Sequence, residues 1–110
     1  MDSFKYVQEK FVVVVKVAKT GDVKDKLCVF AKNKSLALFK IKGKFYCIDN
    51  TCPHLGGPLC KGEVKEFIVE CPWHGSKFDV RNGKLKGPPA DENVKSYKVT
   101  VKGEDILVDL

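Results

Sequence analysis

Two short segments, Cys52-Pro-His54-Leu-Gly-Gly-Pro-Leu59 and Cys71-Pro-Trp-His74-Gly-Ser-Lys-Phe-Asp79, carry the features that decide the fold of this chain. Each segment holds one cysteine and one histidine, and together they use both histidines and two of the five cysteines. Sixteen residues separate His54 from Cys71. Because thiolates and neutral imidazoles both suit iron and zinc, two such loops folded face to face would bring four ligands to one site.

The ligand pattern is compatible with two kinds of metal site. A structural zinc site with two cysteines and two histidines would join the loops and do no chemistry. Zinc motifs, however, usually place like ligands, two cysteines or two histidines, together in one turn. A 2Fe-2S cluster with two thiolates on one iron and two imidazoles on the other requires each loop to reach both irons. The mixed pairs found here favour the cluster.

These motifs, followed by Gly87-Pro88-Pro89, resemble those of Rieske-type 2Fe-2S ferredoxins from about residue 11 to the C-terminus. The resemblance implies that Cys52 and Cys71 bind the buried iron of one 2Fe-2S cluster, whereas His54 and His74 bind the outer iron at an exposed tip. It also implies a surrounding shell that shields the cluster or donates hydrogen bonds to its sulfur atoms, the latter from Gly56, Gly75 and Ser76. The residues of this shell are Leu55, Gly56, Trp73, Gly75, Ser76, Phe78 and Pro88.

The chain departs from the high-potential branch of that family. That branch has an extra cysteine in each ligand loop, joined as a disulfide. Gly57 and Trp73 occupy the matching positions here, and Cys60 lies three residues too far along the chain. Phe78 stands where high-potential members have a tyrosine that reaches a ligand sulfur. We therefore expect a low-potential member, in the lower half of the roughly −150 to +300 mV Rieske range.

For the three remaining cysteines, the sequence indicates no role beyond packing. Cys28 and Cys47 fall in expected strands, where small buried residues are the simplest interpretation, and Cys60 follows the first ligand loop. No apolar run approaches the roughly 18 residues of a membrane span, and the first residues lack a secretory leader pattern. We expect a cytoplasmic protein without a membrane partner, in which metal binding is favoured over a disulfide framework.

Outside the two loops, short apolar runs alternate with turn residues about every ten positions, which is typical of antiparallel β proteins. At most one turn of helix is expected, near residues 22–26 or 91–94, and Asn82-Gly83 predicts a two-residue hairpin. The sequence therefore predicts an all-β Rieske fold: antiparallel sheets packed as a sandwich, with a small subdomain of two ligand loops. The expected strands are 11–17, 27–31, 36–41, 45–48, 67–69, 78–81, 84–86, 97–102 and 106–110.

The 110 residues are enough for a single domain. We expect one Rieske domain over residues 1–110, with the cluster-binding subdomain at about 46–89 and an N-terminal extension at 1–10. The formal charge is +6, and residues 24–44 hold seven lysines and one aspartate. Only one basic residue, Arg81, is an arginine, the type that nucleic-acid recognition favours. We therefore expect no nucleic-acid partner, but a basic face that either attracts an acidic redox protein or is solvated without a partner.

No histidine remains for catalysis once the metal site is formed, whereas a mononuclear iron oxygenase site would need two more. We therefore expect a monomeric carrier of single electrons between a reductase and an oxygenase or other acceptor, and not an enzyme. Two alternatives stay open: the small subunit of a nitrite-reductase-like enzyme, and a basic binding module held together by zinc.

Overall fold

The computed structural model describes residues 12–110, so the expected extension at 1–10 lies outside the described residues. The described chain consists of antiparallel strands and two single-turn 3-10 helices, and the expected all-β fold is confirmed. In this part of the chain no helix is long and apolar enough to cross a membrane. The elements are β1 (Val14–Lys19), η1 (Thr20–Asp22), β2 (Lys26–Ala31), β3 (Lys34–Ile41), β4 (Lys44–Asp49), η2 (Leu59–Lys61), β5 (Glu63–Lys65), β6 (Ile68–Glu70), β7 (Lys77–Asp79), β8 (Leu85–Gly87), β9 (Ser96–Tyr97), β10 (Val99–Lys102) and β11 (Asp105–Asp109).

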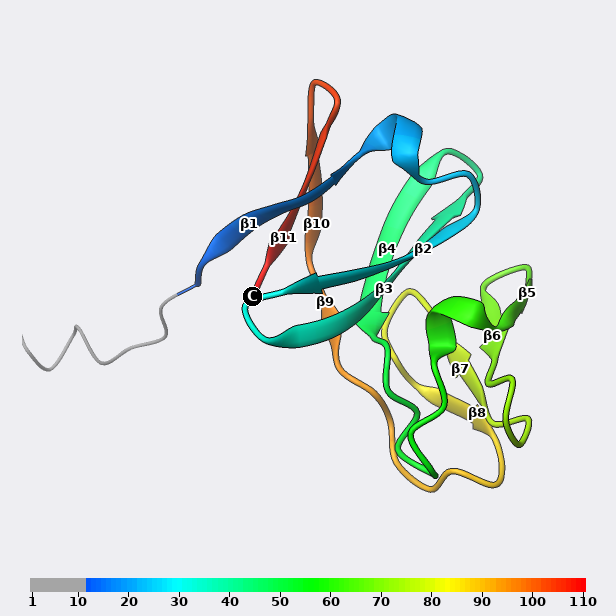
Figure 1. Ribbon diagram of the computed structural model, residues 1–110. Helices are drawn as coiled ribbons and strands as arrows, with labels where there is room; N and C mark the ends of the chain where they lie inside the picture. Colours follow the sequence, from blue (N-terminus) through cyan, green and yellow to red (C-terminus); the bar gives the residue numbers. More distant parts are fainter. Residues whose placement is uncertain (1–11) are drawn as a thin grey trace, which may run out of the picture.

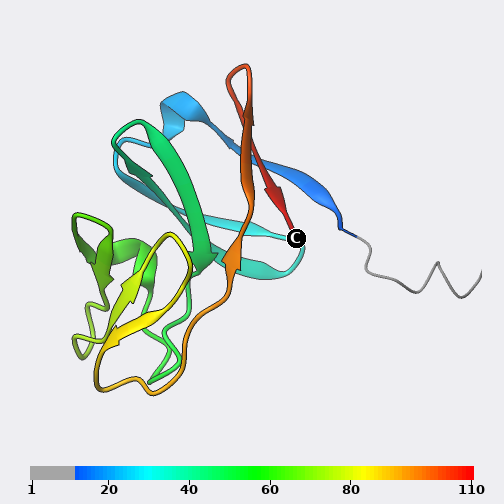
Figure 2. The ribbon, with the colours of Figure 1, turned by 180° about the vertical axis from the view of Figure 1, so that it is seen from behind.

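Three sheets make up the structure (Figures 1 and 2). Their strand orders are β1-β11-β10, β2-β3-β4-β9 and β5-β6-β7-β8. The second sheet lies between the other two and contributes residues to both hydrophobic cores. The third sheet and η2 form a smaller unit beside it, seen at the lower right of Figure 1.

The central strand β3 explains how one sheet serves two cores. Successive side chains of a strand point to opposite faces. Ala37 and Phe39 face the core shared with the third sheet, whereas Leu36 and Leu38 face the core shared with the first. All four are fully buried, which accounts for the uninterrupted apolar run in the sequence.

One expectation about an individual element is wrong, and one element was not expected. The apolar run at 11–17 predicts a buried strand, but β1 begins at Val14 and lies at the edge of its sheet, where Val14 is exposed. Of the two places where at most one turn of helix was expected, a turn forms beside the first, as η1, and none forms at 91–94; the turn of 3-10 helix after the first ligand loop, η2, was not expected. An apolar run alone does not distinguish an edge strand from a central one.

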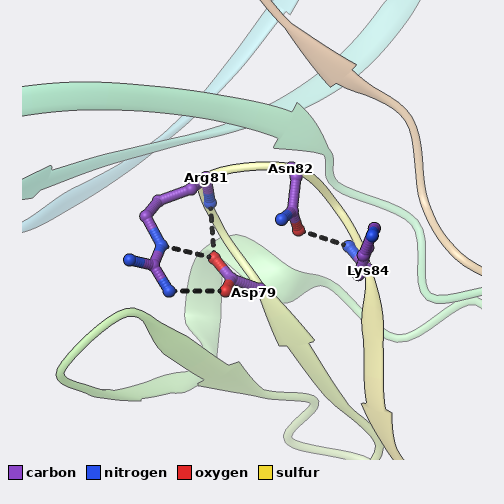
Figure 3. Close-up of polar contacts among 4 residues, drawn as sticks. All are labelled: Asp79, Arg81, Asn82 and Lys84. Carbon is purple, nitrogen blue, oxygen red and sulfur yellow. Dashed lines mark hydrogen bonds and ion pairs between the residues drawn. The ribbon is translucent and has the colours of Figure 1, made fainter.

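The turn between β7 and β8 is held by Asp79 (Figure 3). Its carboxylate accepts hydrogen bonds from the backbone N–H, Nε and Nη2 of Arg81 at 2.9, 3.0 and 2.8 Å. These hydrogen bonds lower the pKa of Asp79. The Oδ1 atom of Asn82 accepts from the N–H of Lys84 at 2.9 Å. The loop therefore spans residues 80–84, and the expected two-residue hairpin is wrong.

Candidate metal centre

The first ligand loop comprises residues 52–59, follows β4 and ends at the first residue of η2, and it closes through two backbone hydrogen bonds. The N–H of Gly56 donates to the carbonyl of Cys52 at 2.8 Å, and the N–H of Cys52 donates to the carbonyl of Gly57 at 2.9 Å. Gly56 has a φ of +86°, in the left-handed region that glycine adopts without strain.

The second ligand loop comprises residues 71–76, between β6 and β7, and repeats the same turn. Gly75, with a φ of +85°, donates to the carbonyl of Cys71 at 3.1 Å, and Cys71 donates to the carbonyl of Ser76 at 2.7 Å. The N–H groups of both turn glycines are thus used within their own loops. Hydrogen bonds from the N–H groups of Gly56 and Gly75 to the sulfur atoms of a cluster stay a prediction.

Both loops deliver their cysteines into one core. Cys52 and Cys71 are 2% and 3% exposed and belong to the same core cluster. Burial raises the pKa of the Cys52 thiol, and the adjacent Cys71 thiol raises it further, whereas the His54 backbone N–H and the Ser76 hydroxyl lower it. The Cys52 and Cys71 side chains therefore lie together in this core.

The two histidines also form a pair. The ring centroids of His54 and His74 are 5.0 Å apart, with planes at 89°. The Nδ1 atom of His54 is buried and has no hydrogen-bond partner among the described residues. Buried polar atoms in folded proteins nearly always have a partner. An orphaned ring nitrogen beside a second imidazole is therefore the arrangement expected of a metal ligand.

Glycine at position 57 is required by the approach of the two loops. A Cβ atom there would lie 2.6 Å from Sγ of Cys71 and 3.0 Å from Cγ of Trp73. The positions that carry an inter-loop disulfide in the high-potential branch are therefore in direct contact here, as a glycine against a tryptophan ring. The Trp73 ring remains 55% exposed.

The other expected shell residues differ in their surroundings. Ser76 is fully buried, and its Oγ accepts a hydrogen bond from the N–H of Ala90 at 2.8 Å. Phe78 is fully buried in the core that contains both ligand-loop cysteines. Leu55 is 59% exposed beside His54, and Pro88 is also exposed.

A disulfide joins Cys28 of β2 to Cys60 of η2, with the Cα atoms 5.1 Å apart. The interpretation of Cys28 as a buried packing residue is therefore wrong, because Cys28 is exposed and covalently bound. Cys47 is free and buried, as expected. Burial, followed by the nearby charge of Asp49, raises its pKa to about 12, so this thiol is unreactive.

The side chains fit a two-iron cluster. They form a pair of soft thiols and a pair of imidazoles on facing loops, which is the ligand set of a cluster with one thiolate-bound and one imidazole-bound iron. In the described part of the chain, no three of the His, Cys, Asp and Glu side chains surround the position of a single metal ion. Residues 5–98 match the family described as the Rieske 2Fe-2S domain. This chain belongs to the Rieske 2Fe-2S family.

Membership of the Rieske family implies one Rieske-type 2Fe-2S cluster. The chain is 36% identical over 90 residues to the ferredoxin component of the naphthalene 1,2-dioxygenase system of Pseudomonas aeruginosa, covering 82% of this chain and 84% of that protein. It is 39% identical over 70 residues to the ferredoxin component of biphenyl 2,3-dioxygenase of Rhodococcus jostii, covering 64% and 65% of the two chains. This Rieske protein is accordingly an electron carrier and not a catalytic enzyme.

Solved Rieske ferredoxins share its structure. The ferredoxin of carbazole 1,9a-dioxygenase from Nocardioides aromaticivorans superimposes with a TM-score of 0.83 at 29% identity, covering 87% of this chain and 96% of that chain. A ferredoxin chain in a complex of reduced oxygenase and oxidised ferredoxin gives a TM-score of 0.82 at 26% identity, covering 88% and 93%. A small subunit of a nitrite reductase matches at 19% identity, which shows the shared fold alone.

Proposed function

We propose that Cys52 and Cys71 bind one iron of the 2Fe-2S cluster and that His54 and His74 bind the other. The observation that carries this proposal is the apposition of a thiol pair and an imidazole pair by two loops with the same turn. When bound, the cluster accepts and releases one electron at a time. The cluster-binding subdomain proposed at about 46–89 contains both loops.

The chain keeps the thiol end in the core and leaves the imidazole end near the surface. Leu55 and Trp73 are large apolar side chains that are more than half exposed, and each neighbours one of the histidines. Exposed apolar side chains gathered in one place commonly mark a contact site. We infer that an oxidoreductase partner covers these two residues and exchanges electrons through the histidine rings.

The ligand assignment is tested by composition and by substitution. The purified protein should be red-brown, with iron and acid-labile sulfide in equal amounts, two of each per chain. Cys52→Ser and Cys71→Ser should each lose the colour, whereas Cys47→Ala, which removes the free thiol outside the loops, should keep it. A colourless protein that contains zinc would contradict the proposal and support the binding module.

The proposed partners are a reductase as electron donor and a terminal oxygenase as acceptor. Two observations support them: the relatives are components of dioxygenase systems, and a similar ferredoxin is seen in complex with its oxygenase. The lysines of residues 24–44 favour an acidic partner surface. The electron-transfer rate should then fall as ionic strength increases, because salt screens the attraction.

Charge reversal at this face provides a matched test. Lys24→Glu with Lys42→Glu should slow electron transfer at low salt, whereas Lys98→Glu with Lys102→Glu, on and beside β10 in another sheet, should have little effect. A rate that is insensitive to both salt and Lys24→Glu/Lys42→Glu would contradict an acidic partner.

We further propose a monomer, to be checked by sedimentation, and a cytoplasmic location, to be checked by fractionation of the source cells.

A further inference from the structure

The Cys28–Cys60 disulfide connects the middle sheet to the first ligand loop. Cys28 lies in β2, at the edge of the sheet, and Cys60 is the second residue of η2, immediately after the loop ends. The two cysteines are 32 positions apart in the sequence. The disulfide therefore joins the C-terminal end of the first ligand loop to β2, a strand that lies far from it in the sequence.

Asn50 holds both ends of the same loop without a covalent bond. Its Oδ1 accepts the N–H of Cys60 at 2.7 Å, its carbonyl accepts the N–H of Leu59 at 2.7 Å, and its Nδ2 donates to Oγ of Ser35 at 3.1 Å. Leu59 is also fully buried. These contacts do not depend on the disulfide, so its opening should loosen the loop without unfolding the protein.

The two cysteine residues of the disulfide differ in accessibility. Cys28 is an exposed residue on an edge strand, whereas Cys60 is 3% exposed. Lys26 lies two positions before Cys28, on the same face of β2, and donates to the carbonyl of Gly62. Lys61 follows Cys60. Positive charges carried by residues this near to the two cysteines in the chain favour the approach of a thiolate and stabilise the thiolate that leaves.

We propose that the Cys28–Cys60 disulfide is a second redox site of this protein, opened by a dithiol, and that its state determines how firmly the first ligand loop holds the cluster. A thiolate of the dithiol attacks Sγ of Cys28, the S–S bond breaks, and Cys60 leaves as a thiolate and takes up a proton. The second thiol of the dithiol then displaces Cys28. Two electrons and two protons pass from the dithiol, which becomes a disulfide, to the protein.

The exchange itself is independent of the cluster, but its consequence for the cluster rests on the proposed ligand roles of Cys52 and His54. The experiment uses the full-length, cluster-containing protein, with reduced thioredoxin as the dithiol probe. Thiols are labelled with a maleimide under denaturing conditions, and amide hydrogen exchange is followed in residues 50–62 and 99–109. Cluster loss to an iron chelator is followed by visible absorbance.

Before thioredoxin treatment, Cys28 and Cys60 should be recovered as one linked peptide, and afterwards both should be labelled. A thioredoxin that lacks its second active-site cysteine should become attached to Cys28. Reduction should accelerate both hydrogen exchange in residues 50–62 and chelator-driven cluster loss about tenfold, with residues 99–109 unchanged. Cys28→Ser should behave like the reduced protein without any thioredoxin, and the control Cys47→Ala should behave like the oxidised wild type.

Several results would overturn the proposal. They are free Cys28 and Cys60 thiols even after treatment with an oxidant, a disulfide that native thioredoxin does not open, and attachment of thioredoxin to Cys60. Unchanged hydrogen exchange in residues 50–62, or unchanged cluster loss after reduction, would equally overturn it. A protein without iron would instead refute the proposed function, while labelling and hydrogen exchange would still decide whether the disulfide is redox-active.

Discussion

The two ligand loops share one turn but are anchored in different ways. In each loop the glycine four residues after the cysteine donates to the cysteine carbonyl, and the cysteine donates to the residue after that glycine. The second loop joins β6 and β7, which pair directly, so the sheet holds both of its ends. The first loop joins β4 to η2 and is held by Asn50 and the disulfide. The same kind of ligand pair can thus be positioned by the hydrogen bonds of paired strands, as in the second loop, or by side-chain contacts and a disulfide, as in the first.

The largest expected effect comes from removing the covalent anchor of the first loop. Cys28→Ser combined with Cys60→Ser should lower the free energy of unfolding by about 4 kcal/mol, because the 32-residue separation restricts the unfolded chain. Denaturant unfolding in the absence of reductant measures the change. Cys47→Ala is the control for loss of a buried sulfur, and an equal effect in both variants would show that the disulfide contributes nothing specific.

The contact between the loops gives the next largest effect. Gly57→Ala would place a Cβ atom 2.6 Å from Sγ of Cys71, and overpacking of this kind costs about 1–3 kcal/mol. We expect the variant to lose most of its iron, as measured by metal analysis. Gly21→Ala is the matched control, because no atom lies within 4 Å of its added Cβ. Full iron content in Gly57→Ala would mean that the loops do not approach this closely.

Ser76 in the second loop carries a hydroxyl, whereas the matching residue of the first loop, Gly57, has no side chain. We expect the Ser76 hydroxyl to affect the reduction potential of the cluster. A hydrogen bond that favours the reduced state by about 1–2 kcal/mol raises the potential by roughly 40–90 mV. Ser76→Ala should lower the potential by that amount, and Phe78→Tyr should raise it. Redox titration measures both. Unchanged potentials would show that neither hydroxyl reaches the cluster.

The smallest expected effect is the pH dependence of stability that comes from Asp79, in the strand that follows the second ligand loop. Arg81 lowers the pKa of Asp79 at the end of β7, so this carboxylate stabilises the fold fully above its unfolded pKa of about 3.9. The contribution disappears as the pH falls through the lower folded value. Because Arg81 is half exposed, Asp79→Asn should cost only about 1 kcal/mol at neutral pH. Unfolding curves of the two proteins should converge in acid, and a constant difference would exclude the ion pair as its cause.

The motif spacing predicted the family, because the paired cysteine and histidine loops are short and local, and the alternation of short apolar runs with turn residues predicted the β architecture. The spacing did not reveal that both loops use the same turn, since the histidine is the third residue of one motif and the fourth of the other. It also gave no signal for the Cys28–Cys60 disulfide, which joins two elements that meet only after folding. The edge position of β1 was missed because a run of valines suits either an edge or a buried strand.

The covalent link at β2 also affects how separate copies of the protein meet. β2 is an outer strand of the middle sheet, and an unpaired strand of this kind can add a strand from another chain. η2 is fastened beside it through Cys60, and Lys26 extends from β2 to the carbonyl of Gly62. Lysines and covering segments are the usual protection of such strands against aggregation. The connection that anchors the ligand loop thus also helps to keep this edge from pairing with another molecule.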